Sequence, residues 1–120
     1  MRQTKSYIEH KGKKYAIVFN LNVMELIQDE YKTLDAWGEL TDGKAGEVNI
    51  KALIFGLTAM INEGIEIDNE DNGTSEPLLT HKQVGRIITD VGITQTAEQM
   101  NGLVIDSTET DEDKENSKNA

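Results

Sequence analysis

Apolar and polar residues alternate along the first part of the chain, which is the pattern of β-strands. Residues 6–9 and 13–19 are rich in β-branched and aromatic side chains, and Lys11-Gly12 lies between them. Such side chains favour strands, and a glycine-containing dipeptide favours a tight turn. We therefore expect an amino-terminal β-hairpin in which every second residue from Tyr15 onward lies on one face of the second strand.

After the hairpin, apolar residues recur every three or four positions, which is typical of helices. Asn22 is a suitable N-cap, so a first helix should begin at about Val23, and a short helical turn around Trp37 should follow it. The strongest helical period covers residues 50–61, and Gly64 is a suitable end for that helix. Its apolar positions are Ile50, Leu53, Ile54, Leu57, Met60 and Ile61.

Two further helices are expected in the second half of the chain. Thr80 and Gln83 have the spacing of a capping box, so a third helix should begin there and end at Gly92. Apolar residues within 93–105 would support a last helix. The predicted fold is therefore an α+β domain, mainly helical, in which an amino-terminal β-hairpin precedes about four helices.

The formal charge of −10 is concentrated in two stretches of the sequence. Residues 66–76 hold five acidic residues and no basic one, and residues 106–120 hold six acidic residues and two lysines. Such stretches have too few apolar groups to offset the entropy cost of ordering them. We therefore expect a single domain over residues 1–105, with an acidic loop at about 65–77, followed by a disordered acidic tail over residues 106–120.

Composition and charge exclude several classes of function. The acidic balance argues against binding nucleic acid through phosphate contacts, which require clustered lysine and arginine. The longest apolar-rich stretch, residues 50–61, is too short to span a membrane. The chain has no cysteine, so it has no disulfide framework and no thiol nucleophile. We expect an intracellular protein with neither nucleic acid nor membrane as a partner.

Candidate catalytic and metal-binding residues are few. The two histidines, His10 and His81, belong to different predicted elements. Residues 68–76 place oxygen-bearing side chains at alternate positions with Gly73 sixth, as in an EF-hand loop, but Leu79 occupies the twelfth position, where a bidentate Glu is needed. We therefore expect no cofactor and no enzyme activity, and weak calcium binding by residues 68–76 stays an open alternative.

The second long helix is a candidate surface for a partner protein. Phe55 and Met60 widen its apolar arc beyond a narrow stripe, and such faces suit partner helices. Burial in the core of the same domain is the alternative, and burial between copies in a homo-oligomer is another. The candidate partner-binding residues are Ile50, Leu53, Ile54, Phe55, Leu57, Met60 and Ile61.

The segment KKYAIVFNLNVMEL, residues 13–26, resembles the opening of the tail assembly chaperones of long-tailed bacteriophages and prophages. In that family a short basic and aromatic strand leads into an F-N-x-N/A-x-x-E-L helix start. Residues 50–63 and 78–88 are also similar to the helical body of these proteins. The residues that the resemblance places at the strand-to-helix corner, in a structural role, are Phe19, Asn20, Asn22, Glu25 and Leu26.

The resemblance implies a non-catalytic protein of the bacterial host cytoplasm. Such a chaperone binds the tape measure protein, keeps it soluble and helps to recruit tail tube subunits during tail assembly, and it is not expected in the mature virion. Two other functions fit a small α+β scaffold of this kind. One is a structural tail component, such as a completion or connector subunit, and the other is a small regulatory protein that uses its acidic segments.

Overall fold

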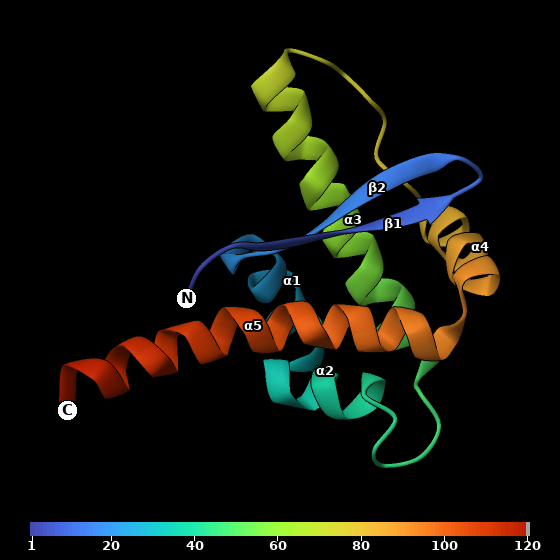
Figure 1. Cartoon of the computed structure of the whole chain (residues 1–120). Coiled ribbons are helices and arrows are strands. Elements are labelled where there is room, and N and C mark those ends of the chain that lie inside the picture. The colour runs from blue at the N-terminus through green and yellow to red at the C-terminus, as the bar shows by residue number, and fades with distance from the viewer. Residues whose placement is uncertain (120) are drawn as a thin grey trace.

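The computed structural model describes residues 1–119, with side chains as far as Thr108. A two-stranded antiparallel hairpin precedes a set of helices (Figure 1). The elements of this part of the chain are β1 Thr4–His10, β2 Lys13–Phe19, α1 Leu21–Tyr31, α2 Leu34–Thr41, α3 Ile50–Asn72, α4 His81–Val91 and α5 Ile93–Asn119. The predicted α+β fold, mainly helical with an amino-terminal hairpin, is confirmed. The short turn expected around Trp37 is a helix of its own, α2.

The hairpin turn follows from the two residues that connect the strands. Lys11 and Gly12 have φ values of 52° and 78°, the positive values that a type I′ turn requires at both positions. This turn matches the right-handed twist of the strands and fixes the pairing of His10 with Lys13, from which the register continues to the far end of the hairpin. β1 begins at Thr4, earlier than predicted.

Helix α3 passes through the centre of the domain and contacts β2, α1, α2, α4 and α5. The core forms where these elements meet, and Trp37 is fully buried in it. The Trp37 indole N–H donates to the Ala52 carbonyl of α3 at 2.9 Å. Gly56 lies beneath this ring, because a Cβ built there would lie only 2.5 Å from Trp37 Cζ2. The absent side chain lets the indole pack directly on α3.

The structure corrects the predicted end of α3. The helix does not stop at Gly64 but runs to Asn72, where Gly73 ends it with a φ of 65° in the left-handed region. Gly64 lies where α3 crosses β2, and a Cβ built on it would lie 2.7 Å from the Ala16 carbonyl oxygen. The glycine is needed for close approach of two backbones, which a sequence pattern does not separate from a helix stop.

Because α3 is longer than predicted, the acidic loop expected at residues 65–77 is also corrected. Residues 65–72 are helical, and only residues 73–80 connect α3 to α4. The EF-hand-like spacing of residues 68–76 therefore lies largely on a helix, where alternate side chains point about 200° apart instead of converging on one ion. Within the part of the chain that the structure describes, no group of three acidic or histidine side chains could hold a metal ion.

The carboxyl-terminal helix extends the folded domain beyond the predicted boundary at residue 105. Ser107 is fully buried, and its hydroxyl donates to the Arg2 carbonyl at 2.9 Å. The Gln99 side-chain amide likewise donates to the Tyr7 carbonyl at 2.8 Å, so α5 covers the outer edge of β1. The domain therefore includes residues up to at least Thr108. Residues 106–108, which were predicted to begin a disordered acidic tail over residues 106–120, therefore belong to α5, and the side chains of residues 109–120 lie outside the described residues.

No helix among the described residues combines the length and the apolar character needed to cross a bilayer.

Candidate partner-binding groove

A groove of about 430 Å³ lies between α1, α3 and the segment that enters α4. Its floor is one face of α3, because the floor residues have the i, i+3, i+4, i+7, i+8 and i+11 spacing of a single helix face. This face covers about three helical turns, or roughly 16 Å at a rise of 1.5 Å per residue. The floor residues are Phe55, Thr58, Ala59, Asn62, Glu63 and Glu66.

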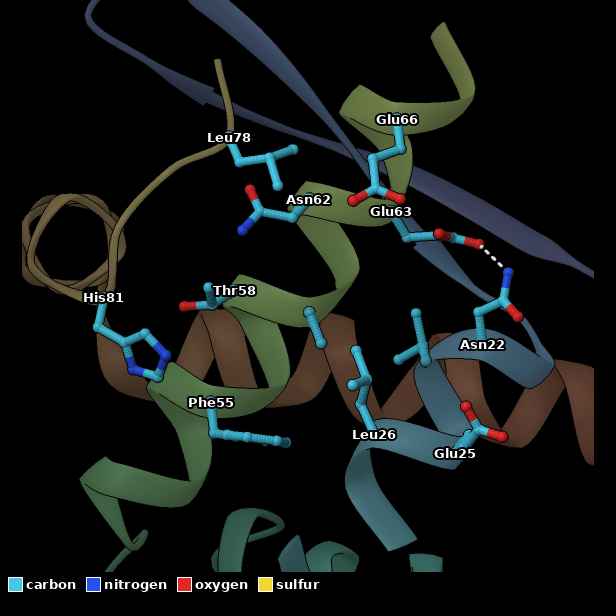
Figure 2. A pocket seen from close by; sticks show the side chains of 12 residues that line it. Asn22, Glu25, Leu26, Phe55, Thr58, Asn62, Glu63, Glu66, Leu78 and His81 are labelled. Atoms are coloured by element: carbon cyan, nitrogen blue, oxygen red, sulfur yellow. Dashed lines mark hydrogen bonds between the residues drawn. The ribbon is translucent and has the colours of Figure 1, made fainter. Parts of the chain in front are cut away.

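Two leucines form opposite walls of the groove (Figure 2). Leu26 comes from α1 and is 47% exposed, and Leu78 comes from the connection before α4 and is 46% exposed. Beside Leu78, the His81 ring meets Phe55 edge-on, with ring centroids 6.4 Å apart, and Tyr31 meets the same phenylalanine at 5.6 Å. The lower part of the groove is therefore apolar and aromatic, and much of its leucine surface faces solvent.

An asparagine of α3 holds the wall that carries Leu78. The Asn62 side-chain oxygen accepts from the Leu79 N–H at 2.8 Å, and its amide donates to the Leu79 carbonyl at 3.0 Å. Two turns further along α3, Asn69 makes the same pair of bonds with the main chain of Glu76, at 2.9 and 3.0 Å. The connection is thus fixed against α3 through its backbone. Sequence analysis missed these residues, although their spacing of seven places both on one helix face.

The upper end of the groove joins α3 to the start of α1. The Glu63 carboxylate accepts from the Asn20 and Asn22 amides at 2.6 and 2.9 Å. The N-cap of α1 is Asn20, whose oxygen accepts from the Val23 N–H at 3.2 Å. The prediction of Asn22 as the cap is therefore wrong, because the helix begins at Leu21, two residues before the predicted start at Val23.

Three acidic side chains line the groove: Glu63 and Glu66 at its upper end on α3, and Glu25 on α1 beside Leu26 (Figure 2). Glu25 and Glu66 are exposed, and Glu63 is half-buried behind them. Among the residues that the structure describes, no lysine or arginine is paired with any of the three. Their charge is compensated only by the two amides on Glu63 and by the positive end of the α1 dipole near it. The groove therefore combines apolar and aromatic surface from Leu26, Leu78 and Phe55 with negative charge from both α1 and α3.

The structure corrects the partner-binding surface expected from the sequence. Four of its seven residues are fully buried in the core and cannot contact a partner: Leu53, Leu57, Met60 and Ile61. Ile50 is 45% exposed, but it lies at the start of α3 beside the preceding loop and not in the groove. Ile54 is half-buried and faces Gly85 of α4. Of the predicted set, Phe55 lines the groove.

The other candidate residues lie elsewhere. His10 Nε2 is 2.6 Å from Asp90 Oδ2, so this histidine joins the hairpin turn to the end of α4. It is in a different depression from His81, and the two histidines do not form one site. A larger cavity of about 720 Å³ lies between α2 and α5 and includes Glu39 and Glu98, but Lys44 is also on its rim, so its charge is mixed.

Comparisons with protein-family models, with curated proteins and with solved structures find no match to this chain. The groove residues themselves are therefore the basis for a functional assignment.

Proposed function

We propose that this chain is a phage tail assembly chaperone that binds the tape measure protein in the groove between α1 and α3. The observation that supports the proposal is the groove itself, which is lined by Phe55 and by the half-exposed Leu26 and Leu78. An apolar groove lined by helices is a common docking site for an amphipathic segment of another protein. The resemblance of residues 13–26 to this chaperone family supplies the class of client.

The proposed activity is reversible shielding of apolar client surface. Each half-exposed leucine would gain about 1 kcal/mol when a client covers it, since complete burial of a leucine is worth roughly 1.5–3 kcal/mol. A contact of this size is released easily, which suits a protein that leaves when tail tube subunits assemble around the client. The net charge of −10 opposes self-association of the loaded chaperone.

To test the proposal, this chain is co-expressed with the tape measure protein encoded in the same genome. The soluble fraction of that client protein is measured. We expect the wild-type chain to raise that fraction and the double variant Leu26→Ser/Leu78→Ser to lose the effect. A matched control, Leu40→Ser/Ile93→Ser, changes two comparably exposed apolar residues outside the groove and should keep the effect.

Thermal unfolding of each variant shows that it is folded before solubility is compared. A client that stays insoluble with the wild-type chain would refute the chaperone proposal. Stoichiometric presence of the chain in purified phage particles would also refute it, and would favour a structural tail component.

A further inference from the structure

We propose that the groove binds an α-helix whose apolar stripe is flanked by lysine or arginine residues that meet Glu25 and Glu66. This inference rests on the proposed function and specifies the chemistry of the client segment. It combines three properties of the groove: the length of its α3 floor, the hydrogen bonding of its main-chain groups, and the carboxylates of Glu66 on α3 and Glu25 on α1, which have no basic partner among the described residues (Figure 2).

The main chain around the groove favours a helix over an extended strand. A strand binds by pairing its N–H and C=O groups with free backbone groups of its host. The floor and one wall are helices, whose backbone groups are bonded internally, and both main-chain groups of Leu79 on the other wall are bonded to Asn62. A helix needs no such partners, because it satisfies its own backbone. Its apolar stripe would lie along the α3 floor between Leu26 and Leu78.

The carboxylates that line the groove favour a cationic helix. Glu25 and Glu66 are exposed and have no basic partner among the described residues, whereas Glu63 is already bonded to Asn20 and Asn22. A lysine or arginine of the bound helix can lay its aliphatic stem on Leu26 while its charged end reaches Glu25, and a second basic residue can reach Glu66. An acidic helix would place like charges together and be rejected. The groove thus selects clients by charge as well as by apolar surface.

Two fluorescent peptides test the inference with the full chain. Both have about 18 residues, enough to form a helix, and share one leucine stripe. One carries lysines beside the stripe near both ends, and the other carries glutamates at the same positions. We expect the lysine peptide to bind more tightly at low salt, and the variant Glu25→Gln/Glu66→Gln to weaken its binding about fivefold, with the difference disappearing at high salt.

The control variant Glu39→Gln/Glu98→Gln makes the same change in net charge at the cavity between α2 and α5, and should bind the lysine peptide as the wild type does. Equal binding of both peptides to the wild type would overturn the inference. An equal loss of lysine-peptide binding in Glu25→Gln/Glu66→Gln and in Glu39→Gln/Glu98→Gln would also overturn it. A loss confined to the control would place the peptide in the other cavity and also overturn it. So would a dimer of the free chain that Leu26→Ser/Leu78→Ser converts to a monomer, since a second copy would then fill the groove.

The two proposals can fail separately. If the client is solubilised through Leu26 and Leu78 but the peptides bind alike, the charge inference is wrong and the chaperone function stands. If the lysine peptide binds as expected but the client stays insoluble, the groove is a site for cationic helices in a protein with another function.

Discussion

Replacing Gly64 with alanine tests the crossing of α3 and β2, which positions the floor of the groove. The new Cβ would lie 2.7 Å from the Ala16 carbonyl oxygen and 3.3 Å from the Ala16 Cβ. The closest atom belongs to the backbone, so no rotamer change can relieve the contact and the helix and strand must move apart.

The size of the effect follows from two opposing terms. Alanine in place of glycine stabilises a helix interior by about 1 kcal/mol, and overpacking of a close contact costs about 1–3 kcal/mol. The free energy of unfolding of Gly64→Ala should therefore fall by about 1 kcal/mol. Urea unfolding followed by the fluorescence of Trp37, the single tryptophan and fully buried, measures it.

Gly85→Ala is the matched control for this substitution. Its Cβ would meet the Ile54 Cδ1 atom at 3.6 Å, an ordinary contact, and α4 gains the same helix propensity. We expect this variant to be about 0.5–1 kcal/mol more stable than the wild type. If Gly64→Ala were as stable as Gly85→Ala, the close approach of α3 and β2 would not exist as described.

Three other substitutions probe particular contacts. Asn62→Ala removes both bonds to Leu79 and should lower stability by about 1–2 kcal/mol, with faster amide exchange at Leu79 as the direct readout. Tyr31→Phe should leave stability unchanged or raise it by up to about 1 kcal/mol, because the buried Tyr31 hydroxyl has no hydrogen-bond partner among the described residues. Burial, and then the nearby Glu30 charge, raise the pKa of Tyr31, so the wild type should lose stability above about pH 10 and Tyr31→Phe should not share that loss. Ser107→Ala should cost about 1 kcal/mol in chemical unfolding, since the Arg2 carbonyl loses its donor.

The elements that local chemistry determines could be predicted from the sequence. Lys11-Gly12 specified the hairpin turn, and both bonds of the capping box between Thr80 and Gln83 are present at the start of α4. In each case the residues that decide the structure lie within a few positions of one another. The second long helix was also recognised, because its core-facing residues keep a helical period that does not depend on their partners.

The remaining features depend on partners that are distant in the sequence. Gly64 has the same local appearance whether it ends a helix or lets it approach Ala16, and only the packing of β2 distinguishes the two. The groove also depends on residues that are distant in the sequence. Leu26 and Leu78 belong to separate elements, and Asn62 of α3 holds the segment that carries Leu78 by bonding to Leu79. Helical periodicity identified the apolar residues of α3, but it could not separate the buried ones from Phe55 on the exposed side.

Site-specific photo-crosslinking tests most directly whether a client occupies the groove. A photoreactive residue is placed at position 26 or 78 in the groove, or at position 7, where Tyr7 is exposed on the hairpin and does not line it. Each chain is irradiated while it is bound to the tape measure protein. We predict crosslinks to the client from positions 26 and 78 and none from position 7. Crosslinks from position 7 alone, with the client still held in solution, would contradict the account.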